Sequence, residues 1–254
     1  SVDEPVGAGR PDDYAEPPVA AKPPPKMARP KNGGGGHEED APAAANGGGG
    51  EGAGTGEGGD EDYAVVRVLY ATDRNHVADA KPAEAFGGAR AALSYGYCDV
   101  SIPRDHRLGE LEEPSIWRLE FREDPEKHVV LMSAVVRPKD AFFRELAERV
   151  AASERSNAFL FVHGYNVAFA EAARRTAQIS YDLAFDGAPV FYSWPSQGKT
   201  QAYTVDEQNI EWSQANLRGF LDDFFTRSQA QNVYLIAHSM GNRALTRAVA
   251  GLMT

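Results

Sequence analysis

The 254-residue sequence has little cysteine, no long apolar run and no cluster of positive charge. Its single cysteine, Cys98, excludes an intrachain disulfide. No group of Cys and His residues has the spacing of metal ligands, so we expect neither a metal nor a cofactor. The longest apolar run covers residues 129–136 and is interrupted by Ser133. Because a membrane-spanning helix needs roughly 20 apolar residues, no membrane span is predicted.

Large apolar side chains are absent from residues 1–62, which contain no Ile, Leu, Phe or Trp. The same segment holds 15 of the 25 glycines and 9 of the 16 prolines. Ordering a backbone costs roughly 1 to 2 kcal/mol per residue, and this segment has no apolar burial to offset that cost. We therefore predict a disordered, Gly/Pro-rich acidic tail or linker over residues 1–62 and one folded domain over residues 63–254.

Positive charge is scarce in the tail and scattered elsewhere. Residues 1–62 contain 13 acidic and 5 basic side chains, which account for −8 of the net charge of −11, so the folded part is nearly neutral. A nucleic-acid-binding surface needs clustered Lys and Arg, and nucleic acid is therefore excluded as a partner. The sequence opens with Ser1 rather than Met, which is compatible with a removed leader. A cytoplasmic location is slightly favoured, the cell envelope stays open, and no pattern indicates an oligomeric state.

From residue 63 onward, short β-branched and aromatic runs alternate with helical periodicity. This alternation predicts an α/β fold with a mostly parallel sheet and helices on both faces. Strands are expected at residues 65–71, 97–102, 116–121, 128–135, 158–162, 190–193 and 233–237. The last three are continuously apolar, which predicts strands buried on both faces. Helices are expected at residues 142–150, 167–183, 204–224 with Thr204 as N-cap, and 240–252.

The stretch around Ser239 reads as an apolar strand, a sharp turn and a helix. At such a nucleophile elbow a strained turn lifts the serine hydroxyl above the sheet, and the residues two positions away must be small. Ala237 and Gly241 are small, although the commoner pattern has Gly at the first of these positions, and His238 has a packing role beside the serine. We predict that Ser239 is a catalytic nucleophile and that the Met240 amide stabilises an oxyanion at the helix N-terminus.

A second apolar strand ends in His163-Gly164 and is followed by a helix, which is where an oxyanion loop belongs. The Tyr165 amide would be the second donor to the oxyanion, with Gly164 permitting the turn. The alternative is that His163 and Gly164 only end a strand and Ser239 only caps a helix. Trp194 follows another strand at the same sheet edge, where it would either line an acyl pocket or pack in the interior.

Five motifs carry a resemblance to a known family. They are Tyr-Ala-Thr-Asp-Arg-Asn (70–75), Phe-Val-His-Gly-Tyr-Asn (161–166), Arg-Thr-Ala-Gln (175–178), Ser-Trp-Pro-Ser (193–196) and Ala-His-Ser-Met-Gly-Asn (237–242). Residues 65–254 resemble a bacterial esterase/lipase-like branch of the α/β-hydrolases, much of it catalogued as a domain of unknown function. The resemblance implies an α/β-hydrolase fold with Ser239 as nucleophile and His163-Gly164 introducing the oxyanion hole. It leaves the substrate undefined.

The triad acid and histidine follow the serine in this superfamily, and 15 residues follow Ser239 here. We therefore expect a C-terminally incomplete fold, with both partners in a segment beyond residue 254, and a nearly inert chain. The favoured hypothesis is a serine hydrolase that cleaves a small-molecule or lipid carboxylic ester through an acyl-Ser239 intermediate. The alternative is a non-catalytic module of the same fold that binds a ligand or partner.

Overall fold

The computed structural model describes residues 63–109, 111 and 124–253, over which strands and helices alternate as the apolar periodicity predicts. The strands are β1 (Tyr63–His76), β2 (Phe86–Pro103), β3 (Val130–Arg137), β4 (Asn157–Val162), β5 (Ala188–Ser193) and β6 (Asn232–Ala237). The helices are α1 (Lys139–Ala152), α2 (Phe169–Asp182), α3 (Tyr203–Trp212), α4 (Gln214–Arg227) and α5 (Met240–Leu252). None of these helices is long and apolar enough to cross a membrane.

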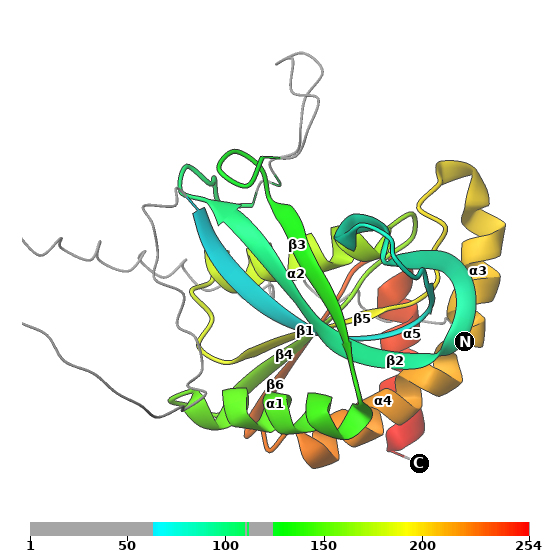
Figure 1. Cartoon of the computed structure of the whole chain (residues 1–254). Helices are drawn as coiled ribbons and strands as arrows, with labels where there is room; N and C mark the ends of the chain where they lie inside the picture. Colours follow the sequence, from blue (N-terminus) through cyan, green and yellow to red (C-terminus); the bar gives the residue numbers. More distant parts are fainter. Residues whose placement is uncertain (1–62, 110, 112–123, 254) are drawn as a thin grey trace, which may run out of the picture. The chain divides into compact units, whose positions relative to one another are not determined.

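One mixed sheet contains all six strands in the order β3-β2-β1-β5-β4-β6 (Figure 1). The strands β1, β5, β4 and β6 run parallel to their neighbours among them, and β2 and β3 add an antiparallel extension beside β1. Val162 of β4 pairs with Tyr192 of β5 on one side and with Ala237 of β6 on the other. The loops that follow β4, β5 and β6 therefore start side by side at one edge of the sheet.

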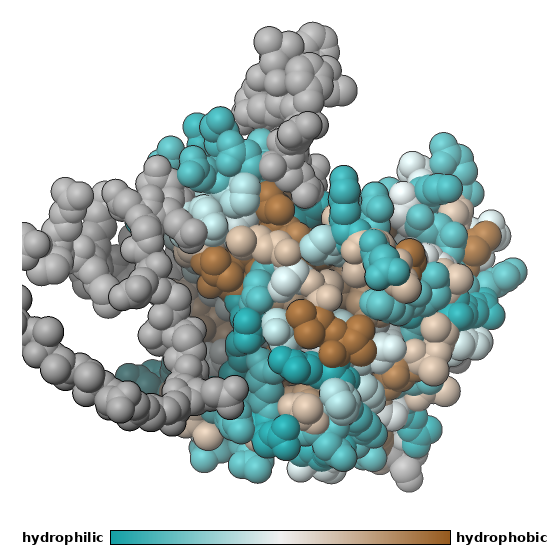
Figure 2. Space-filling model, viewed as in Figure 1, coloured by the Kyte–Doolittle hydropathy of each residue, from teal (hydrophilic) through white to brown (hydrophobic). Residues whose placement is uncertain are grey.

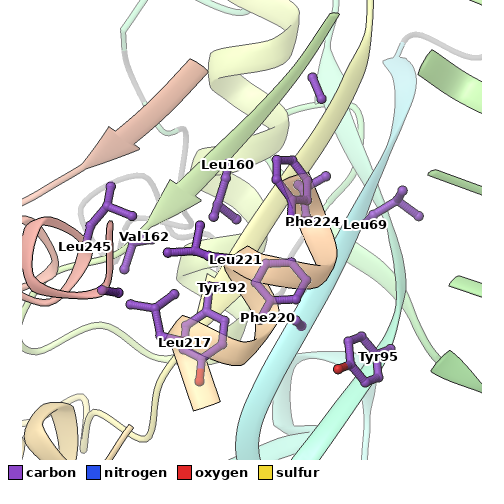
Figure 3. Close-up of a cluster of buried hydrophobic side chains, with 14 of the residues drawn as sticks. Leu69, Tyr95, Leu160, Val162, Tyr192, Leu217, Phe220, Leu221, Phe224 and Leu245 are labelled. Carbon is purple, nitrogen blue, oxygen red and sulfur yellow. The ribbon is translucent and has the colours of Figure 1, made fainter. Parts of the chain in front are cut away.

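Helices cover both faces of the sheet. The apolar sides of α1, α4 and α5 pack on one face, where Phe220 and Leu217 of α4 meet Leu160 and Tyr192 of the strands (Figure 3). Helix α2 packs on the other face, with Phe169 against a second buried cluster of strand residues. Figure 1 shows α1 and α4 along the lower side of the sheet and α2 on the opposite side. Continuous apolar strands such as β4 and β5, each with six buried residues, fit this three-layer arrangement.

The predicted elements differ from the observed ones mainly at their ends. Strand β2 begins at Phe86, eleven residues before the predicted start, because its first half consists mostly of Gly and Ala and has no strand-like pattern. The helix predicted over residues 204–224 is two helices that meet at Ser213, whose ψ of −11° departs from the helical value. Thr204 lies inside α3 and is not its N-cap. The strand predicted at 116–121 and the tail at 1–62 lie outside the described residues.

Strand β6 differs from the prediction in its burial. Its residues are half-buried or exposed, with Tyr234 51% exposed, instead of buried on both faces. The reason is its position, because within the described part of the chain β6 pairs only with β4 and ends the sheet. An apolar composition alone does not distinguish a central strand from an edge strand.

The face of the molecule that Figure 2 shows is mostly hydrophilic. Figure 2 shows one face of the molecule, on which apolar patches are small and separated by hydrophilic residues. Exposed apolar side chains on β1 and β3 include Val65, Met132 and Val136. Scattered exposure of this kind is normal for a folded domain and indicates no binding surface by itself.

The junction of α3 and α4 faces a buried carboxylate at the end of β1. Asp73 is fully buried, and its Oδ2 accepts hydrogen bonds from the Tyr192 hydroxyl at 2.8 Å and the Asn216 amide at 3.1 Å. Its Oδ1 has no hydrogen-bond partner among the described residues. Burial raises the pKa of Asp73 above the ordinary 3.8, and the bonds from Asn216 and Tyr192 oppose that rise only in part.

We expect Phe220→Ala to lower the free energy of unfolding by about 3 to 5 kcal/mol, because the ring is fully buried among the strands and α1. Urea unfolding measures the change. Phe225→Ala, on the same helix but 42% exposed, is the matched control and should cost far less. Equal losses from the two variants would contradict the described core.

We expect Asp73→Asn to raise stability at pH 7. A carboxyl group whose pKa is raised on folding favours the folded state when protonated, so its contribution is lost as the pH rises from 3.8 through the folded-state pKa. The asparagine variant should lack this decline in melting temperature between acidic and neutral pH. Asp79→Asn, at an exposed site, is the control. A wild-type decline that persists unchanged in Asp73→Asn would refute the assignment.

Candidate active site

The loops that follow β4, β5 and β6 meet at the carboxyl edge of the parallel strands, where ligands of open α/β sheets usually bind. The loop after β4 carries His163, Gly164 and Tyr165, and the turn after β6 carries Ser239. The two segments predicted from the sequence as functional are thus neighbours, because β4 and β6 pair directly.

Ser239 lies on a sharp turn between β6 and α5. Its φ of 50° and ψ of −122° place a non-glycine residue in the left-handed half of conformational space, which costs of order 1 to 3 kcal/mol. The turn is closed by hydrogen bonds from the Gly241 amide to the His238 carbonyl at 2.9 Å and from the Asn242 amide to the Ser239 carbonyl at 3.1 Å. The Ser239 side chain is exposed, and its hydroxyl makes no hydrogen bond to another described residue.

Two glycines allow the turn and the loop after β4 to touch. A Cβ atom on Gly241 would lie 2.5 Å from the His163 carbonyl oxygen and 2.6 Å from that of Val162. A Cβ atom on Gly164 would lie 3.0 Å from Cβ of Ser239 and 2.8 Å from Nδ1 of His238. Ala237, on the other side of the serine, pairs with Val162 and its methyl group is accommodated. Only glycine fits at 164 and 241 without displacing backbone.

Two backbone amides beside Ser239 have no acceptor among the described residues, namely those of Tyr165 and Met240. Met240 is the first residue of α5, where the helix dipole adds partial positive charge. Tyr165 lies in a loop whose next residue, Asn166, has a φ of 59°. The Asn166 amide donates to Asp206 Oδ2 at 3.2 Å and the Val167 amide donates to Ser196 Oγ at 3.1 Å, which hold the loop in this shape.

The His163 ring is part of the interior. It is 1% exposed, stacks on Trp194 with 5.0 Å between ring centroids, and its Nδ1 lies 2.8 Å from the Gly164 carbonyl oxygen. A carbonyl only accepts, so Nδ1 carries the proton and Nε2 is left to accept from Ser193 Oγ at 3.1 Å and Arg74 Nη2 at 3.4 Å. Burial, with the nearby charge of Arg74, lowers the pKa of His163 to about 3. The ring is therefore neutral and unable to serve Ser239 as a base.

Trp194 packs in the interior and does not line an open pocket. Its side chain is 1% exposed, and its indole N–H donates to the His163 carbonyl at 2.9 Å. The stack of Trp194 on His163 joins the loop after β5 to the loop after β4. The described contacts therefore support the packing alternative for this residue.

A groove of about 770 Å³ opens beside the turn, between α2 and the ends of β4 and β6. Its apolar lining includes Phe161, Ile179 and Ile236, and Gly164 and His238 line the end nearest Ser239. A concave, largely apolar surface of this size is typical of a small-molecule site. Trp194 is not part of the lining.

Other histidines and carboxylates of the described residues have contacts of their own. His106 Nε2 lies 2.8 Å from Asp182 Oδ1, the His128 ring accepts the Asp124 amide, and His76 packs on Phe86. Asp186 accepts from Ser153 and the Glu154 amide, and Asp206 accepts from Ser196 Oγ at 2.6 Å. None of them is hydrogen-bonded to Ser239. Among the residues that the structure describes, no three His, Cys, Asp or Glu side chains are grouped as a metal site.

Two residues beneath the loops were not singled out from the sequence. Asp206 is fully buried and binds the loop after β4 as well as the Gln197 amide at 2.8 Å. Arg74, the second, is buried at the end of β1 and contacts both loops. Arg74 lies within the motif at residues 70–75 that contributes to the family resemblance. That motif is the one feature of the sequence that could have drawn attention to Arg74. Asp206 lies in the first turn of α3, where an acidic residue is common and gives no sign of a wider role.

Comparison with known proteins bears on the fold. Residues 138–254 match the model of a protein family described as "Alpha/beta hydrolase of unknown function (DUF900)", a stretch that includes β4, β5, β6 and both loops of the site. No curated protein and no solved structure matches the chain. The mixed sheet with helices on both faces, the strand–turn–helix at Ser239 and this match show that the domain has an α/β-hydrolase fold and that residues 138–254 are similar to this family.

Proposed function

We propose that this domain is a serine hydrolase that cleaves a carboxylic ester through an acyl intermediate on Ser239. The observation that carries the proposal is the strained, exposed turn at Ser239 in contact with the Gly164 loop. Strain at a non-glycine residue persists only where the surrounding structure enforces it, and it is concentrated at functional sites.

The two amides without acceptors complete the proposed chemistry. When the Ser239 hydroxyl attacks an ester carbonyl, negative charge develops on the carbonyl oxygen. The amides of Met240 and Tyr165 are the donors for that charge, in the arrangement that this superfamily uses. Loss of one such donor typically costs 10²- to 10³-fold in rate. The apolar groove beside Gly164 and His238 would hold the acyl part of a small-molecule or lipid ester.

One observation favours a second function, a non-catalytic binding module. Among the described residues, no histidine or carboxylate is hydrogen-bonded to the Ser239 hydroxyl, and His163 is committed to the interior. A serine without a base is a weak nucleophile. The hydrolase proposal therefore requires that residues outside the described ranges supply the base and the acid.

A fluorophosphonate probe separates the two functions. Applied to the complete natural gene product that contains this chain, it should label one serine per molecule, and Ser239→Ala should abolish the labelling. Thr246→Ala, an exposed change on the same helix α5, is the control and should label like the wild type. Absence of labelling in a folded wild type would instead favour the binding module.

We expect Gly164→Ala to lower the rate constant of labelling about 100-fold, because its methyl group would displace the Ser239 turn and a shift of about 1 Å has an effect of that size. Gly219→Ala is the matched control, since a Cβ atom there meets open space on α4. Mass spectrometry over time measures both rates. A normal rate in folded Gly164→Ala would show that the contact between the loop and the turn is unimportant.

A further inference from the structure

Arg74 lies in β1 at an irregular part of its pairing with β2. The register shifts on both sides of Arg74, between Thr72 and Arg74 and again between Arg74 and His76, and the extra residues belong to β2. Irregular pairing of this kind is common next to active sites. The arginine side chain is 2% exposed and lies beneath the loops that carry the candidate site.

The guanidinium uses all five of its N–H donors. Nε donates to Ser193 Oγ at 2.8 Å, and Nη1 donates to the carbonyls of Gly87 at 3.1 Å and Ser196 at 2.8 Å. Nη2 donates to the Val167 carbonyl at 2.7 Å and faces Nε2 of His163 at 3.4 Å. A lysine ammonium has three donors at a single point and could not make this set of contacts.

Two of these contacts enclose the Tyr165 amide. His163 lies two residues before Tyr165 and Val167 lies two residues after it, and both are bound by the same nitrogen of Arg74. The hydroxyl of Ser193, which accepts from Nε, also donates to His163 Nε2 and so reinforces the first anchor. A five-residue loop held at both ends by one planar group has little freedom to move its central amide.

We propose that Arg74 is a positioning residue that sets the direction of the Tyr165 amide toward Ser239. The inference rests on the proposed function, because it gives that amide a partner in the reaction. It also explains why the oxyanion site would be preorganised: a buried cation beneath the loop holds the loop in place. Preorganised donors need no reorganisation when charge develops, and this is where their effect on rate originates.

The charge of Arg74 persists despite its burial. Burial lowers the pKa of Arg74 to about 10, with Asp73, Asp206 and Glu171 acting in the opposite direction, so the group is cationic at neutral pH. That charge disfavours protonation of His163 and keeps its Nε2 available as an acceptor. The loop is thus held by a charge-assisted arrangement at neutral pH.

The test separates positioning from simple loss of fold. In the complete natural gene product, fluorophosphonate labelling is followed over probe concentration for wild type, Arg74→Lys and Arg247→Lys, the last an exposed control on α5. We expect Arg74→Lys to lower the maximal labelling rate constant about 100-fold. The half-saturating probe concentration and the final fraction labelled should stay near the wild-type values. Partial unfolding would instead lower the final fraction and leave the rate constant of the folded molecules unchanged.

Ser193→Ala keeps the guanidinium and removes only the hydroxyl between Arg74 and His163, so it decides the case if Arg74→Lys does not fold. We expect about a tenfold fall in its maximal rate constant. Wild-type rate constants in folded Arg74→Lys, or in Ser193→Ala where the lysine variant does not fold, would overturn the positioning role. A wild type that fails to label, by contrast, would overturn the proposed function itself.

Discussion

The candidate site depends on how closely the chain segments after β4 and β6 approach each other. The two strands pair directly, and the segments that leave them touch at Gly164 and Gly241, where a side chain of even one carbon would meet backbone or the serine itself. This contact has two consequences. It forces Ser239 into a strained conformation, and it brings the Tyr165 loop beside the first amide of α5.

A polar layer beneath the loops keeps this contact rigid. Burying a cation and a carboxylate is costly unless each finds a full set of partners. Arg74 and Asp206 meet that condition, because the first uses five donors and the second accepts from three residues of the loops after β4 and β5. Satisfied networks of this kind specify one conformation. In this conformation the amides of Tyr165 and Met240 have no acceptor among the described residues.

Buried and exposed side chains at this sheet edge have different roles: His163 and Trp194 are buried, whereas Ser239 is exposed. His163 and Trp194, both at the sheet edge, are used to stack the two loops and are neutral and enclosed. Ser239 stands outside this layer and is exposed, and its neighbour His238 lines the groove. Under the proposed function, Ser239 would be the nucleophile, the Tyr165 and Met240 amides would be the oxyanion donors, and the groove would hold an apolar group.

Much of the fold follows from local patterns. The alternation of apolar runs with helical periodicity indicates a sheet between helices, and the strand–turn–helix at Ser239 and the apolar strand ending in His163-Gly164 are visible as such, since turn chemistry and periodicity involve neighbours in sequence. Only the tertiary structure decided that β6 ends the sheet of the described residues, that Trp194 packs on His163, and that Arg74 reaches the Tyr165 loop. These features depend on strand order and on contacts between residues far apart in sequence, about 90 positions for Arg74, and such contacts leave no periodic trace along the chain.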